Sequence, residues 1–214
     1  VDLLAELEQR GVRYVHWKSN EHLEEALRGE TDLDLLVHRE DQSEFESTVR
    51  EYGFVPMSLP RARRFPGRSG FLGFDWTTGS LAQLDVHHAL VLGEQLVKNH
   101  HLPIEEWLLT DTTHLLGVQI PSAARESIVF YLRVCFKSTL RQRLSAAVRN
   151  TPVIPENIQR EARWLAGQVD ENELTKALDS VELPIPKDGV EEFFRRISNG
   201  GLEWRYLART KRSL

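Results

Sequence analysis

Two aspartates, Asp32 and Asp34, interrupt a segment that otherwise has the character of a buried strand, GETDLDLLV (residues 29–37). Because side chains alternate between the two faces of a strand, Asp32, Asp34 and Leu36 are expected on one face, and the apolar Leu33, Leu35 and Val37 on the other. Carboxylates about 7 Å apart at Cα repel each other unless a cation lies between them. The pattern therefore predicts a divalent metal site, with Mg²⁺ or Mn²⁺ as the cofactor. The open alternative is a strand end that carries two solvated aspartates.

A third carboxylate and a histidine lie on another strand-like segment, AQLDVHHAL (residues 82–90), where alternation places Asp85 and His87 on one face. If this segment pairs beside the strand of Asp32 and Asp34, three acids can hold two metal ions roughly 3.5 to 4 Å apart. Such a centre suits a nucleoside triphosphate and an attacking hydroxyl, whose proton Asp85 would accept. His87 would support the cluster or contact a phosphate. The open alternative for Asp85 is a salt bridge to a nearby arginine.

The segment HWKSN (residues 16–20) is predicted to turn from a strand into a helix. Backbone N–H groups and the positive end of a helix dipole bind phosphate readily at such a corner. Lys18 would add a positive charge for the β- or γ-phosphate, and Ser19 and Asn20 would contact phosphate oxygens. The alternatives are a solvated surface lysine at Lys18 and a helix cap formed by Ser19 or Asn20.

The elements that must position these residues alternate between helix and strand up to about residue 120. A hairpin is predicted from two strands, 70–76 and 81–90, joined by the turn TTGS. From about residue 121 onward the hydrophobic period is helical throughout. We therefore expect an α+β fold with a small mixed β-sheet and flanking helices in residues 1–120, followed by a C-terminal helical bundle in residues 121–214. The individual helices and strands are predicted at 2–10, 12–17, 20–28, 33–38, 41–52, 53–58, 122–149, 155–169, 171–181 and 188–198.

Composition excludes several classes of protein. With 214 residues and a single cysteine, Cys135, the chain can bury a core but cannot form an internal disulfide, so a reducing, cytoplasmic location is expected. No apolar run approaches the roughly 18 to 20 residues that span a bilayer, so no membrane association is expected. The net charge of −5 makes nucleic acid an unexpected partner, although RARR (residues 61–64) and Arg68 form a local basic patch that could meet an anionic ligand.

These segments together resemble the nucleotidyltransferase superfamily that includes DNA polymerase beta. Ser19 resembles the serine of its corner, Asp32 and Asp34 resemble the paired metal ligands, and Asp85 resembles the third acid. More narrowly, WKS, GETDLDLLV and LDVHH are similar to the motifs of a bacterial group of nucleotidyltransferase-like domains. The resemblance covers about residues 12–95. It departs from the wider superfamily at Lys18, where that superfamily has glycine.

The resemblance implies a Mg²⁺-dependent transfer of a nucleoside monophosphate from a nucleoside triphosphate, expected to be ATP, to a hydroxyl acceptor. That acceptor would be a small molecule, a sugar or a protein. Two alternatives stay open: a catalytically degenerate module that senses a nucleotide or binds a partner, and a metal-dependent phosphohydrolase. The basic tail ARTKRSL (residues 208–214) suggests that a further C-terminal domain follows in a longer chain.

Overall fold

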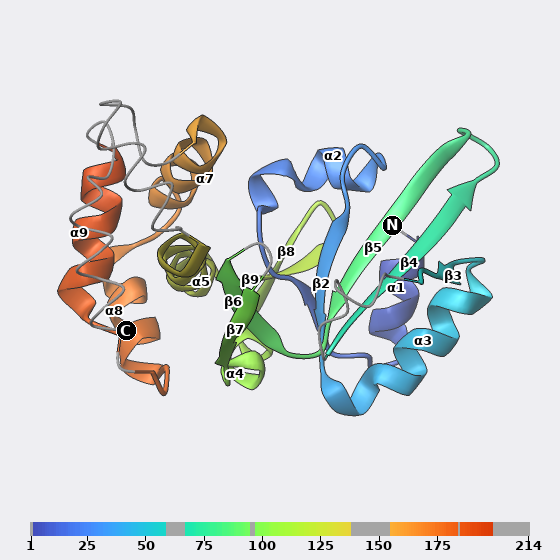
Figure 1. Ribbon diagram of the computed structural model, residues 1–214, viewed down its shortest axis with the longest axis horizontal. Coiled ribbons are helices and arrows are strands. Elements are labelled where there is room, and N and C mark those ends of the chain that lie inside the picture. Colours follow the sequence, from blue (N-terminus) through green and yellow to red (C-terminus); the bar gives the residue numbers. More distant parts are fainter. Residues whose placement is uncertain (1, 59–66, 95–96, 138–154, 184, 199–214) are drawn as a thin grey trace. The chain divides into compact units, whose positions relative to one another are not determined.

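The computed structural model describes residues 2–58, 67–94, 97–137, 155–183 and 185–198. The chain divides into two compact units (Figure 1). The first unit comprises Val1–Val91 and His101–Ser122, and the second comprises Leu92–His100 and Ala123–Leu214. The α+β class, with a mixed sheet, flanking helices and C-terminal helices, is confirmed. The assignment of residues 1–120 and 121–214 to separate domains stays a prediction.

A five-stranded sheet in the order β1-β2-β5-β4-β3 organises the first unit. The parallel pair β2 and β5 lies at its centre, and the remaining neighbours pair antiparallel. The expected hairpin is β4 and β5, and it does pair beside the strand that carries Asp34. The strands are β1 (Tyr14–His16), β2 (Leu33–Val37), β3 (Val55–Pro56), β4 (Arg68–Asp75) and β5 (Ser80–His87).

Two helices, α1 (Asp2–Gln9) and α3 (Gln42–Glu51), contribute apolar faces to the core of this unit. Leu7 and Phe45 are fully buried and share one hydrophobic cluster with Leu35 of β2. Burial of each such side chain contributes about 1.5 to 3 kcal/mol, so the sheet face that carries Leu33 and Leu35 of β2 is fixed toward the core. The opposite face of β2, which carries Asp34, is thereby directed away from that cluster.

The structure differs from the sequence prediction in its short elements. The predicted helix 20–28 is a 3₁₀ turn, η1 (Asn20–His22), followed by the five-residue helix α2 (Leu23–Leu27). The hairpin of β8 (Thr112–Leu115) and β9 (Val118–Pro121) was not expected, because its turn places Leu116 at a φ of 52° before Gly117 at 78°. Such turns favour Asn-Gly or Asp-Gly, and Leu-Gly is a weak signal. Three more elements were missing from the sequence prediction, which placed no helix or strand between residues 91 and 121. They are β6 (Leu90–Glu94), β7 (Val97–Leu102) and α4 (Glu105–Thr110).

Helices build most of the described part of the second unit, as predicted. They are α5 (Ala123–Lys137), α7 (Glu156–Ala166), α8 (Glu171–Ser180) and α9 (Lys187–Ser198). Tyr131 of α5 and Phe193 of α9 pack edge to face with ring centroids 5.1 Å apart. Arg133 of α5 is buried and donates to Glu161 of α7 at 2.9 Å. No described helix is long and apolar enough to cross a membrane.

Gly29 fixes how closely the segment before β2 approaches β5. Its φ is +78°, and a Cβ there would lie 2.3 Å from the backbone oxygen of Leu81. We expect Gly29→Ala to lower the free energy of unfolding by about 2 to 5 kcal/mol, combining a left-handed backbone cost with a steric clash. The matched control is Gly53→Ala, at a φ of +81° with nothing within 4 Å.

The control should cost only the backbone term, about 1 to 2 kcal/mol. Urea unfolding of both variants measures the difference. Equal losses in the two variants would show that the approach of Gly29 to Leu81 does not constrain the fold.

Candidate metal centre

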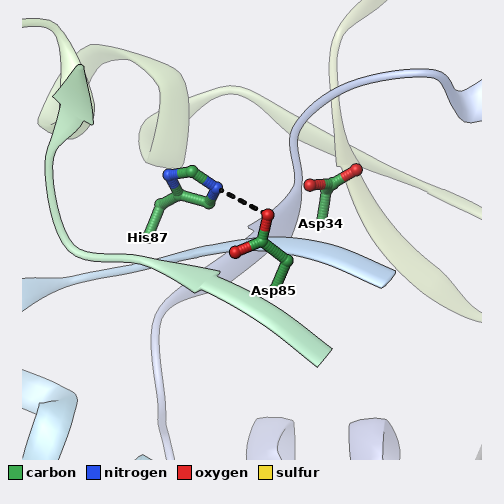
Figure 2. A group of neighbouring side chains, drawn as sticks. All are labelled: Asp34, Asp85 and His87. Atoms are coloured by element: carbon green, nitrogen blue, oxygen red, sulfur yellow. Dashed lines mark ion pairs between the residues drawn. The ribbon is translucent and has the colours of Figure 1, made fainter. Parts of the chain in front are cut away.

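Asp34 and Asp85 are direct neighbours across the parallel pair β2 and β5. Both are almost fully buried, with 7% and 5% of their surface exposed. His87 lies two residues beyond Asp85 on the same face, and ligand atoms of the three side chains all lie within 4.8 Å of one another (Figure 2). Strand alternation from the sequence therefore anticipated the convergence of Asp34, Asp85 and His87 from two separate strands.

Two cations hold the two buried carboxylates. Nζ of Lys18 lies 2.5 Å from Oδ1 of Asp34. Nε and Nη2 of Arg68 donate to the two carboxylate oxygens of Asp85 at 2.6 and 2.7 Å. The salt bridge that was the alternative for Asp85 is thus present, and Lys18 is an ion-pair partner rather than a solvated lysine.

Sequence reasoning placed Arg68 in a basic patch but missed its contact with Asp85. The signal that could have found it is the register of the predicted hairpin. Arg68 is the first residue of β4, and the antiparallel pairing sets it opposite His87 of β5. Its long side chain can then reach the carboxylate of Asp85, two residues earlier on the neighbouring strand.

The charges and burial of the centre shift its pKa values in different directions. Burial raises the pKa of Asp34, and the neighbouring Lys18 opposes that rise. Burial would also raise the pKa of Asp85, but the contacts with His87 and Arg68 outweigh it and lower the pKa below its usual value. Burial lowers the pKa of His87, although Asp85 opposes this shift. The centre at neutral pH therefore contains an ionised Asp85 and a neutral imidazole.

Asp32 lies outside the group of three but beside it. It immediately precedes β2, is partly exposed, and makes no ion pair or hydrogen bond in the part of the chain that the structure describes. A pocket of about 190 Å³ opens next to it. The pocket is lined by His16, Lys18, Ser19, His22, Ala26, Thr31, Asp32 and Asp34. Two of the predicted metal ligands and two of the predicted phosphate-binding residues thus share one cavity.

The corner before η1 departs from the expected helix start. Ser19 adopts a left-handed φ of 58°, and its side chain does not cap the 3₁₀ turn. Asn20 is buried, and its Oδ1 lies 2.6 Å from Nδ1 of His16. Because η1 and α2 are both short, the helix dipole at this corner would attract a phosphate only weakly. Phosphate binding at this corner would depend on side chains, above all on Lys18.

Trp17 contacts a residue of the corner, Lys18, and a residue of the metal centre, His87. Its ring meets that of His87 edge to face, with centroids 5.2 Å apart, and Nζ of Lys18 lies 5.1 Å from the Trp17 ring centroid. Trp17 is itself buried. Packing on this ring orients both the imidazole and the lysine relative to the two aspartates.

Comparisons with known proteins add little to this geometry. No family model and no curated protein matches the chain. Among solved structures, the chain is similar to the antibiotic-resistance factor ANT(2'')-Ia, with a TM-score of 0.41 and 14% sequence identity. The similarity covers 83% of this chain and 86% of that one. A likeness this weak identifies neither a family nor an activity.

Proposed function

We propose that this chain is a metal-dependent nucleotidyltransferase that moves a nucleoside monophosphate from a nucleoside triphosphate, ATP in the first instance, to a hydroxyl acceptor. The observation that carries the proposal is the register of β2 and β5, which sets Asp34 and Asp85 side by side next to the pocket lined by Lys18 and Ser19. Paired carboxylates beside a cationic phosphate pocket are what a metal–triphosphate complex requires.

The residues fit a divalent ion. Asp34 and Asp85 offer carboxylate oxygens, and Nε2 of buried His87 has no hydrogen-bond partner among the described residues, although it lies 3.4 Å from Oδ2 of Asp85. A neutral imidazole nitrogen without a hydrogen is a metal ligand, and an N,O donor set suits Mn²⁺ at least as well as Mg²⁺. Asp32 can add a further oxygen from the pocket side. A bound ion would supply charge neutralisation of the phosphates and a lower pKa for the acceptor hydroxyl.

The residues of this chain would bind the phosphates and hold the ion. Lys18 and Ser19 would bind phosphate oxygens in the pocket, and Asp34 would hold the ion at the pocket edge. Asp85 is a weak base while Arg68 and His87 lower its pKa, so in that state it serves better as an ion-holding group than as a proton acceptor. Its role as the partner of the acceptor hydroxyl then requires Arg68 to move away.

One observation favours a second candidate, a non-catalytic module that binds a nucleotide or a partner. Lys18 and Arg68 already neutralise both buried aspartates, as permanent internal counter-ions would do in a degenerate site. Such a module would bind a nucleotide without consuming it, and product analysis separates the two candidates.

The test is incubation of the purified chain with each of four α-³²P-labelled nucleoside triphosphates, Mg²⁺ or Mn²⁺, and a panel of sugars, small alcohols and proteins. Label on an acceptor, with release of pyrophosphate, supports the transferase. Free nucleoside monophosphate would indicate the phosphohydrolase alternative. Binding without any product would favour the non-catalytic module. The absence of both binding and product would show that the nucleotide is not a ligand, and would overturn the proposal.

Lys18 should contribute strongly to nucleotide affinity. With Mn²⁺ at saturation, Lys18→Ala is expected to weaken binding of a non-hydrolysable triphosphate by about 1 to 3 kcal/mol, the range for a charge-assisted hydrogen bond. Isothermal titration measures the change, and Lys176→Ala on the exposed side of α8 is the control. Because Lys18→Ala removes the ion-pair partner of Asp34 and could destabilise the protein, a melting curve for each variant verifies that it folds. An unchanged affinity would show that Lys18 serves only Asp34.

A further inference from the structure

The acids of the candidate metal centre are nearly balanced in charge by side chains of the same chain. Asp32, Asp34 and Asp85 carry three negative charges when ionised, and Lys18 and Arg68 return two positive ones. One negative charge remains, and it faces the pocket at Asp32.

A divalent ion that enters this centre meets two positive groups already in contact with its ligands. Both oxygens of Asp85 accept from Arg68, and Oδ1 of Asp34 lies against Lys18. Like charges within a few ångströms in a partly buried site repel one another, so a bound ion weakens the contacts of both cations with the carboxylates. Either the ion stays out, or a cation moves.

Both cations are able to move. The side chain of Arg68 remains 26% exposed although its partner Asp85 is buried, and the side chain of Lys18 is 18% exposed and lines the pocket. Each is a long side chain that can turn its charged end toward water while its stem stays packed. The carboxylates, in contrast, are held by the paired strands β2 and β5.

We propose that Lys18 and Arg68 are exchangeable counter-ions: they hold the acids while no metal is bound, and metal binding displaces them to bind the polyphosphate of the nucleotide. This inference rests on the proposed function and assigns Arg68, in addition to Lys18, as a polyphosphate-binding residue. The charge balance supports the exchange, because one divalent ion turns the remaining negative charge of the centre into a net positive charge. A polyphosphate anion then neutralises that charge, and the displaced guanidinium is a strong phosphate ligand.

The exchange predicts opposite changes in two affinities. Arg68→Gln removes the positive charge and keeps a polar side chain. In the absence of nucleotide, it should bind Mn²⁺ at least about tenfold more tightly than the wild type, because Lys18 is then the one cation left to displace from these acids. With Mn²⁺ at saturation, it should bind α,β-methylene ATP about tenfold more weakly, because one phosphate contact is lost. A substitution that merely disrupted the site would weaken the binding of both Mn²⁺ and α,β-methylene ATP.

The measurements are Mn²⁺ titration followed by electron paramagnetic resonance of the free ion, and calorimetry with α,β-methylene ATP. Arg50→Gln is the matched control, since Arg50 forms an exposed ion pair with Glu46 on α3 and does not line the pocket. Arg68→Lys keeps the charge and should leave Mn²⁺ affinity near the wild-type value. Lys18→Gln repeats the test at Asp34 and decides the question if Arg68→Gln does not fold.

The outcomes separate the inference from the function on which it rests. Wild-type Mn²⁺ binding that neither Arg68→Gln nor Lys18→Gln tightens would overturn the exchange and leave the metal-dependent transferase standing. Mn²⁺ binding by the variants but not by the wild type would overturn the exchange, because the metal then fails to displace the cations of the natural chain, and it would favour permanent counter-ions. Failure of every folded form to bind Mn²⁺ would overturn both the exchange and the metal-dependent function.

Discussion

Asp34→Asn is expected to abolish nucleotidyl transfer, with kcat lowered by at least about 10³ and the stabilisation of the protein by Mn²⁺ lost. The substitution preserves shape but removes the charge and the oxygen with which Asp34 would hold an ion beside the pocket. Interactions that stabilise the developing charge of a phosphoryl-transfer transition state are commonly worth 10² to 10³ or more each. Lys18 loses its counter-ion at the same time, so repulsion of the metal adds to the defect.

Single-turnover rates and the shift of the melting temperature in millimolar Mn²⁺ measure these two effects. The control is Asp41→Asn, which also breaks a carboxylate–arginine pair, Arg13 Nε to Asp41 Oδ2 at 2.7 Å, but lies outside the pocket. A folded Asp34→Asn protein that still transfers nucleotide at the wild-type rate would remove Asp34 from the site.

Asp85→Asn is expected to lower kcat by about 10² to 10⁴ while leaving the affinity for the nucleotide nearly unchanged, if Asp85 acts as proposed on the acceptor hydroxyl in the transition state. The same substitution removes the partner of Arg68. A fully buried pair broken in this way costs about 3 to 5 kcal/mol. The side chain of Arg68 is partly exposed and can turn to water, so we expect the loss of stability to be smaller, about 1 to 3 kcal/mol.

Melting temperature and single-turnover rate, measured on one preparation, distinguish the two roles of Asp85. A catalytic role predicts a slow reaction even at temperatures where the variant is fully folded. A purely structural role predicts a destabilised protein whose folded fraction reacts at the wild-type rate, and that result would assign Asp85 to the ion pair alone.

The sequence predicted the pair of strands at the heart of the site because the physics there is local and periodic. Alternation along GETDLDLLV and AQLDVHHAL predicts the faces of Asp34, Asp85 and His87, and the pairing of the two strands, which the sequence left as a condition, is supplied by the structure. Asp32 was predicted to join the cluster on the same basis. It precedes β2 and lines the pocket beside the group of Asp34, Asp85 and His87, so its role as a metal ligand stays a prediction.

The features that escaped prediction depend on contacts distant in sequence or on unusual backbone conformations. The partner of Arg68 depends on the register of the hairpin, whose predicted strands (70–76 and 81–90) did not extend to Arg68, and the partner of Lys18 depends on how the corner after β1 lies against β2. The corner at Ser19 and the turn at Leu116 both use a positive φ at a residue other than glycine, against local preference. The burial of Arg133 depends on Glu161, which comes from another helix of the second unit.

The parallel pairing of β2 and β5 also determines when the centre can form as the chain folds. Arg68 and Asp85 are only 17 residues apart and belong to one hairpin, so their ion pair can form early and locally. Asp34 joins them only after the whole segment from α3 through β4 has crossed over, a contact of high loop-closure cost. A ligand that bridges Asp34 and Asp85 would therefore stabilise an arrangement completed late. It should slow unfolding of the native protein while hardly accelerating its folding.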